Sequence, residues 1–167
     1  MENRLDRRDF LKAASTTAVG LSVMRPERVF GAQANSAVGL GIIGCGGRGT
    51  TVASSFVNNT ETRIVALADL FQDRLDKARE HFNKLSRAKG QPELKDANLF
   101  RGSQAYQKLL ASPEVDAVLI SSPPFLHPEH LMAAVKAGKH VYCEKPVAVD
   151  PHGCRLVKEA GKIAGQK

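Results

Sequence analysis

The sequence predicts an α/β fold built on a doubly wound parallel sheet. Short apolar segments rich in β-branched residues alternate with amphipathic segments from residue 38 onward, which is typical of strands joined by crossover helices. The first apolar segment runs into Gly44, Gly46 and Gly49, and this G-x-G-x-x-G spacing is that of the first turn of a Rossmann fold. The second apolar segment ends at Asp69, about 20 residues beyond the last of these glycines, where such folds place an acidic residue.

The length and composition fit one globular domain. The chain has 167 residues, of which 43% are hydrophobic and 25% are charged, enough apolar residues to form a core. The net charge of +7 does not indicate nucleic-acid binding, because the basic residues are spread along the chain without an aromatic-rich basic stripe. Cys45, Cys143 and Cys154 have the spacing of neither a metal site nor a disulfide framework, so we expect no bound metal and assign them to packing.

Residues 1–34 are expected to be a twin-arginine export signal. Arg7–Lys12 reads Arg-Arg-Asp-Phe-Leu-Lys and follows the pattern R-R-x-F-L-K, although Asp6 stands where Ser or Thr is usual. The uncharged stretch 13–24 is too short to cross a bilayer as a helix, and Ala32–Ala34 offers a small-x-small cleavage site. The alternative is a helix packed on the domain, which the small side chains of this stretch disfavour. We therefore expect a periplasmic or otherwise exported protein that engages the twin-arginine export machinery.

The dinucleotide-binding Rossmann domain is assigned to residues 35–167. After the opening strand, the expected strands are Arg63–Ala68, Asn98–Arg101, Val115–Ile120 and His140–Cys143. The first two expected helices are Thr50–Asn58 and Gln72–Leu85. Ser103 is expected to cap a third helix that runs to Ala111, and a fourth is opened by Pro128 and closed by Gly138. The last helix has Asp150 as its N-cap and Pro151 as its first residue. A polar loop is expected between residues 86 and 97.

The glycine turn has the chemistry of a phosphate site. Gly44 permits the tight turn, Gly46 lets the backbone approach a pyrophosphate, and Gly49 lets the helix pack closely on the strand. The helix N-terminus then offers free N–H groups and a partial positive charge. Glycine is common in any turn, so the alternative is a loop that binds no phosphate. The residues around the glycines distinguish a phosphate site from such a loop.

Three clusters are expected to meet at the carboxyl ends of the strands, where open α/β sheets bind ligands. They are the glycine turn with Asp69, the turn Ser121–His127 with its two prolines, and Glu144–Pro146. Asp69 is placed to accept hydrogen bonds from the ribose hydroxyls and to repel the 2′-phosphate of NADP, which favours NAD. Arg48 and Arg74 weaken that preference, so NADP remains the alternative cofactor.

From Val38 to the end, the chain resembles the cofactor domain of the glucose–fructose oxidoreductase/inositol dehydrogenase (Gfo/Idh/MocA) family. The resemblance is carried by Gly44–Gly49, by Asp69, by Val115–Ile120 with the following prolines and histidine, and above all by Gly138–Pro146, which ends in Glu-Lys-Pro. It implies that Lys145 lies beside the nicotinamide and the substrate, where it would orient and polarise the substrate hydroxyl or carbonyl and assist proton transfer. The alternative for Lys145 is a solvated surface lysine.

The resemblance also implies a set of cofactor-binding residues. These are Gly44, Cys45, Gly46, Gly47, Arg48, Gly49, Asp69, Arg74, Ser122, Pro123, Pro124, His127, Glu144 and Lys145. Several have a structural alternative: His127 as a helix-entry residue, the two prolines as a stiffener of their turn, and Arg74 as an exposed helix residue rather than a platform for the adenine.

The implied activity is that of an exported NAD(P)-dependent oxidoreductase acting on a sugar or polyol. Two alternatives stay open: an NAD-dependent glycosidase of the same family, and a non-catalytic dinucleotide-binding fragment. Family members carry a second, mostly antiparallel domain, and this sequence stops at Lys167, where a sixth strand is expected. The sequence thus resembles a truncated copy that would be inactive alone. Homo-oligomer formation is left open.

Overall fold

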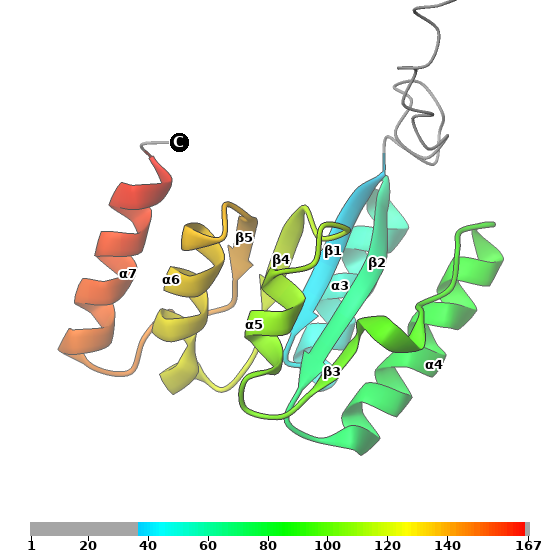
Figure 1. The fold of residues 1–167 in the computed structure, drawn as a ribbon, viewed down its shortest axis with the longest axis horizontal. Coiled ribbons are helices and arrows are strands. Elements are labelled where there is room, and N and C mark those ends of the chain that lie inside the picture. The colour runs from blue at the N-terminus through cyan, green and yellow to red at the C-terminus, as the bar shows by residue number, and fades with distance from the viewer. Residues whose placement is uncertain (1–36, 166–167) are drawn as a thin grey trace, which may run out of the picture. The chain divides into compact units, whose positions relative to one another are not determined.

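Five parallel strands form one sheet in the order β3-β2-β1-β4-β5 (Figure 1). The computed structural model describes residues 37–165, so the expected export signal lies outside the described residues. The strands are β1 (Val38–Ile43), β2 (Thr62–Asp69), β3 (Leu99–Arg101), β4 (Ala117–Ile120) and β5 (His140–Cys143). The order reverses between β1 and β4, which confirms the predicted doubly wound sheet.

Helices cover both faces of this sheet. They are α3 (Gly47–Asn59), α4 (Gln72–Ala88), α5 (Ala105–Leu110), α6 (His127–Lys136) and α7 (Pro151–Ala164), with 3₁₀ turns η3 (Asp96–Asn98) and η4 (Pro124–Leu126). Figure 1 shows α5 and α6 in front of the strands and α3 behind them. This is the arrangement that right-handed crossovers give when the chain winds outward from β1 in both directions. None of the helices described is long and apolar enough to cross a membrane.

Each face of the sheet has its own apolar core. One core packs α3 and α4 on the strands through residues such as Ala53, Phe82 and Ile42, and the other packs α5 and α6 through residues such as Leu109 and Val118. The central strands β1 and β2 are buried on both sides, which explains why their sequences are continuous apolar runs rather than alternating patterns.

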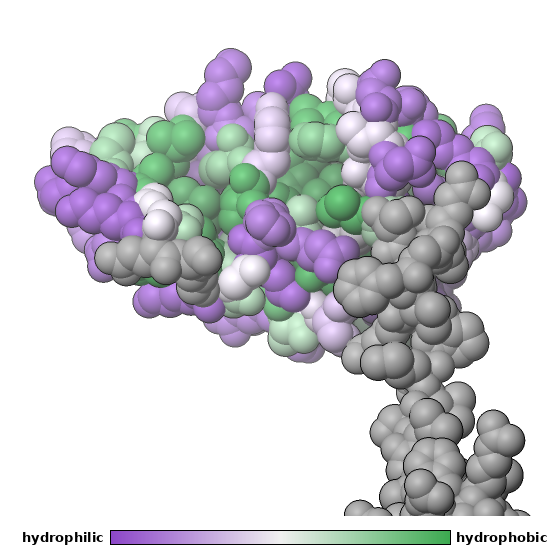
Figure 2. Space-filling view, turned by 90° about the horizontal axis from the view of Figure 1, so that it is seen from above, coloured by the Kyte–Doolittle hydropathy of each residue, from purple (hydrophilic) through white to green (hydrophobic). Residues whose placement is uncertain are grey.

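The last helix lies at the β5 end of the domain and packs against α6. The Asp150 side chain caps it by accepting a hydrogen bond from the Gly153 N–H at 2.6 Å, as the sequence predicted. Gly153 and Ala160 are buried, whereas Leu156 remains half-buried. In the view from above Figure 1, hydrophobic surface gathers between hydrophilic flanks (Figure 2).

The edge at which the strands begin is held by side-chain bonds to the backbone. Lys139 Nζ donates to the carbonyl oxygens of Ser112, at 3.0 Å, and Val115, at 2.7 Å. An Asp116 carboxylate oxygen accepts the Gly39 N–H at 2.8 Å. These contacts fix the entry of β1, β4 and β5 without using any residue assigned to the cofactor.

Several element bounds differ from the sequence-based prediction for local physical reasons. Helix α3 starts at Gly47 rather than Thr50, because the glycine turn passes directly into helix. Helix α4 continues to Ala88 before Gly90 adopts a positive φ of 64°. Ser103 does not cap α5, whose N-cap is Gln104, and β4 starts at Ala117, two residues later than expected.

We expect Gly49→Ala to destabilise the domain strongly. A Cβ at this position would lie 2.1 Å from the Gly44 carbonyl oxygen and 2.4 Å from Ser121 Oγ, so the helix would have to move away from the strand. The expected loss is about 1–3 kcal/mol of unfolding free energy, read from urea denaturation. Gly47→Ala is the matched control, since a Cβ there meets nothing within 4 Å and should leave stability unchanged or raise it. Equal stability of the two variants would contradict this account of the packing.

Candidate functional site

The glycine turn lies directly against the turn that follows β4. Gly44 has a positive φ of 95°, and its N–H donates to the Ala68 carbonyl oxygen at 2.8 Å. A Cβ on Gly44 would lie 2.6 Å from the backbone nitrogen of Ser122. Ser121 Oγ in turn donates to the Gly44 carbonyl oxygen at 2.7 Å. The β1 and β4 turns therefore form one continuous backbone surface at the point where the strand order reverses.

The first turn of α3 keeps its N–H groups free of side-chain caps. Its N-cap is Gly46, which accepts the Thr50 N–H at 2.9 Å, and within residues 37–165 no side chain caps this end. No acidic side chain occupies the first turn. The leading N–H groups of a helix lack an intrahelical acceptor, so this end is open to an anionic ligand such as a phosphate.

Asp69 is tied to the glycine turn by a hydrogen bond. One carboxylate oxygen, Oδ2, accepts the Cys45 N–H at 2.7 Å, and the other, Oδ1, accepts the Phe71 N–H at 3.0 Å. Each carboxylate oxygen has a second lone pair, so both stay able to accept hydrogen bonds from ligand hydroxyls. The structure thus places the end of β2 and the end of β1 side by side, as the sequence predicted.

Arg74 and Phe71 stand next to this pair of turns. The Arg74 guanidinium carbon lies 5.4 Å from the centre of the Phe71 ring, and its Nη1 lies 3.0 Å from where a Cβ of Gly46 would be. Phe71 is 52% exposed. Phe71 was not selected from the sequence, although an aromatic residue two positions after Asp69 was a usable signal.

An ion pair connects the glycine turn with the Glu-Lys-Pro segment. Arg48 Nη2 donates to Glu144 Oε1 at 2.8 Å. The hydrogen bond to Arg48 lowers the pKa of the Glu144 carboxyl, and the same bond raises the pKa of the Arg48 guanidinium. Glu144 is almost buried, with 7% of its side chain exposed, whereas 62% of the Arg48 side chain is exposed. The pair bridges α3 and the end of β5.

Lys145 lies at the same edge, with its side chain exposed. Its ammonium group forms no hydrogen bond or ion pair to any residue between 37 and 165. The carbonyl oxygen of the next residue, Pro146, accepts a hydrogen bond at 2.8 Å from His127 Nδ1. The segment that carries Lys145 is therefore held by its backbone, which leaves the Lys145 amine available to a ligand.

His127 has both ring nitrogens on backbone carbonyl groups. Besides Pro146, it contacts the Ser122 carbonyl oxygen through Nε2 at 2.7 Å, and its side chain is buried. Ser122 Oγ lies 2.9 Å from His130 Nδ1. Pro123 is exposed and Pro124 half-buried at the start of η4. Sequence reasoning missed His130, although its spacing of three from His127 places both on one side of the helix.

The two cysteines near the site behave as packing residues. Cys45 is buried, and its burial, followed by the charge on Asp69, raises the pKa of its thiol. Burial and Glu144 raise the pKa of Cys143 to about 11. Both thiols are therefore protonated at neutral pH and poor nucleophiles. Among residues 37–165, no group of three or more His, Cys, Asp or Glu side chains is placed to hold a metal ion.

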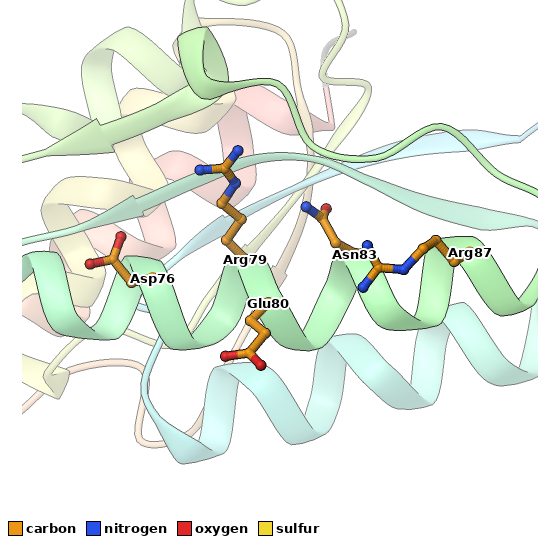
Figure 3. A pocket seen from close by; sticks show the side chains of 5 residues that line it. All are labelled: Asp76, Arg79, Glu80, Asn83 and Arg87. Atoms are coloured by element: carbon orange, nitrogen blue, oxygen red, sulfur yellow. The ribbon is translucent and has the colours of Figure 1, made fainter.

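A polar pocket lies on α4, separate from the strand ends. Asp76, Arg79, Glu80, Asn83 and Arg87 line it (Figure 3). Arg79 pairs with Asp96 and Arg87 with Glu93. Asn83 accepts the N–H of Leu94. These bonds tie α4 to the following loop and neutralise both arginines, so the pocket has a structural explanation.

The fold and this arrangement of residues define a dinucleotide-binding Rossmann domain. The chain matches the model of the oxidoreductase family with an NAD-binding Rossmann fold, Gfo/Idh/MocA, over residues 38–167. The protein therefore belongs to this family, as the sequence analysis inferred. Members bind NAD(H) or NADP.

Three relatives illustrate the range of the family. A glycosyl hydrolase family 109 protein from Solibacter usitatus is 31% identical over 87% of this chain and 34% of its own length. An inositol 2-dehydrogenase from Pseudomonas fluorescens is 35% identical over 77% of this chain and 34% of its own. The crystal structure of a 3-ketoreductase from Actinomadura kijaniata with NADP and TDP-benzene superposes with a TM-score of 0.59 at 27% identity, covering 77% of this chain and 35% of that one. The chain spans about a third of the length of these relatives.

Proposed function

We propose that this chain is the cofactor-binding domain of an exported NAD(P)-dependent oxidoreductase that acts on a sugar or polyol. The observation that carries the proposal is the convergence of the glycine turn, Asp69 and Lys145 on one edge of the sheet, linked by the Cys45–Asp69 and Arg48–Glu144 contacts. The inositol 2-dehydrogenase relative supports a polyol as the substrate class.

The residues present fit a nicotinamide dinucleotide. The uncapped N–H groups at the start of α3 suit a pyrophosphate, and the lack of a Cβ at Gly46 and Gly47 lets it approach the backbone. The remaining lone pairs of Asp69 suit the ribose hydroxyls. When bound, the nicotinamide ring accepts or donates a hydride.

Lys145 is the residue to which we assign the chemistry. Its exposed amine lies one residue from the backbone bond between Pro146 and His127, so its main chain is fixed while its side chain reaches outward. In the oxidation direction, the Lys145 ammonium would first lose a proton to solvent, and the neutral Nζ would then accept the proton of the substrate hydroxyl, directly or through a bound water. In reduction it would donate a proton to the carbonyl oxygen.

A second candidate function follows from the glycosyl hydrolase relative. Such a glycosidase would use a bound NAD for transient oxidation only, so sugar would be released without net cofactor reduction. The two activities are separated by incubating the protein with a synthetic glycoside and, separately, with inositols and aldoses plus NAD. Glycoside cleavage without NADH absorbance supports the hydrolase, and NADH formation supports the oxidoreductase. Turnover in neither assay contradicts both.

Asp69 should make the site prefer NAD over NADP, because its carboxylate would lie close to the 2′-phosphate. We expect Asp69→Asn to reduce the ratio of NAD to NADP affinity about tenfold, equivalent to about 1.4 kcal/mol, as measured by calorimetric titration of the folded protein with each cofactor. The ratio is informative because a general loosening of the turn would weaken the binding of both cofactors to the same extent. Asp73→Asn, in the exposed first turn of α4, is the control and should leave the ratio unchanged. A wild-type preference for NADP would overturn the assignment to NAD.

We also propose that the protein is exported in the folded state by the twin-arginine pathway. The support is the Arg7–Lys12 motif and the cleavage site at Ala32–Ala34. A reporter enzyme fused after residue 34 should reach the periplasm with the native signal, and replacing Arg7 and Arg8 by lysine should keep it in the cytoplasm. Replacing Arg4 by lysine, outside the motif, is the control. Export that persists in the double lysine variant would refute the proposed route.

A further inference from the structure

Two histidines in the first turn of α6 are buried, although the proposed chemistry uses neither of them. His127 is 1% exposed and His130 is 6% exposed. Both contact Ser122, His127 through the carbonyl oxygen and His130 through the hydroxyl group. Both rings therefore contact the turn after β4, next to the segment that carries Lys145.

The hydrogen bonds of His127 require two donors. Its Nε2 lies 2.7 Å from the Ser122 carbonyl oxygen and its Nδ1 lies 2.8 Å from the Pro146 carbonyl oxygen. Carbonyl oxygens only accept, and a neutral imidazole carries a single N–H. A neutral ring would leave a nitrogen lone pair facing an oxygen lone pair at hydrogen-bond distance, inside the protein, where such a repulsion is poorly screened. A ring protonated at both nitrogens satisfies both contacts.

We propose that His127 is a positioning residue that, with both ring nitrogens protonated, ties the Lys145 segment to the turn after β4. Loss of either hydrogen bond frees residues 144–149 to move. We call the two hydrogen bonds of His127, to the Ser122 and Pro146 carbonyl oxygens, the bridge. The bridge is present in the protein without ligand, and only the role of Lys145 in this inference rests on the proposed function.

The other titratable groups around the bridge are compatible with one positive charge on His127. On α6, His130 has a lowered pKa, mainly because of burial and in addition because of His127, with Glu129 opposing. His130 is therefore expected to be neutral near pH 7. Its Nδ1 lies 2.9 Å from Ser122 Oγ, and its ring lies 4.4 Å from that of Tyr106 on α5, centre to centre.

The nearby carboxylates each have another partner. Glu129 accepts the Tyr106 hydroxyl hydrogen at 2.6 Å, Glu144 pairs with Arg48, and Asp150 caps α7, whose Gly153 lies against Pro128. The partners of His127 in the described residues are thus two backbone carbonyl groups rather than a carboxylate.

The first test observes the ring directly. Long-range proton–nitrogen correlation spectra of the full chain, with uniformly ¹⁵N-labelled protein and no dinucleotide, report whether each nitrogen of His127 carries a proton. Both nitrogens of His127 should carry a proton, while His130 shows the pattern of a neutral ring. An unprotonated His127 nitrogen in the folded protein would overturn the proposal.

The second test follows the Lys145 segment. Amide hydrogen exchange of residues 144–149 at one fixed pH should be about tenfold faster in His127→Ala, which lacks both ring donors, than in wild type. His127→Gln keeps amide N–H donors and should restore part of the protection. His152→Gln, on the exposed start of α7, is the matched control and should exchange at the wild-type rate.

The outcomes separate this inference from the proposed function. Wild-type exchange rates in His127→Ala refute the bridge, whatever the protein binds. A confirmed bridge in a protein without affinity for NAD or NADP refutes the proposed function instead. If His127→Ala does not fold, the spectrum of the wild-type ring decides.

Discussion

The close approach of α3 to the end of β1 is the constraint on which the site depends. The Gly44 carbonyl oxygen occupies the space that a Cβ of Gly49 would fill, at 2.1 Å, and Ser121 Oγ closes the same space from β4. Because nothing projects from either glycine, the helix N-terminus, the β1 turn and the β4 turn share one small volume. The Cys45 N–H is then in reach of Asp69, and Arg48 in reach of Glu144. Each of these contacts relies on backbone packing set by the two glycines.

The contacts at this edge differ in what they contribute. The Arg48–Glu144 pair has one well-exposed partner, and exposed ion pairs add little stability because water and salt screen them. Its importance is positional, since it links a helix after β1 to the segment after β5. The Asp69 contact is different, because the carboxylate accepts two backbone N–H groups and charge-assisted bonds of this kind are shorter and stronger. The turn at the end of β2 is therefore better fixed than the segment after β5.

Much of the fold could be predicted from the sequence because its rules are local or topological. Apolar runs of the right length gave β5 to the residue, and the alternation of strands and helices implied parallel pairing, which in turn placed the three clusters at one edge. The end of α4 and the cap of α5 were wrong, since a polar stretch such as 86–88 extends a helix when no glycine or proline intervenes. Boundaries of this kind depend on tertiary packing.

The site was predicted less completely than the fold. That Asp69 would adjoin the glycine turn follows from strand order alone, but Arg48 and Glu144 are 96 residues apart in the chain and their pairing requires the side-chain geometry. The same holds for His127, whose ring bonds to a residue 19 positions away. Periodicity places such a residue on a helix face, and it does not reveal which backbone oxygen that face meets.

The edge where the strands begin has a consequence for how this domain evolves. Lys139 and Asp116 lock β1, β4 and β5 there through bonds to main-chain atoms, which keep their identity whatever side chains the neighbouring positions carry. Part of the scaffold is thereby maintained away from the edge that carries the glycine turn and Asp69. Exposed side chains at that edge, such as Lys145, can change without loss of these bonds, which leaves room for new chemistry on the same scaffold.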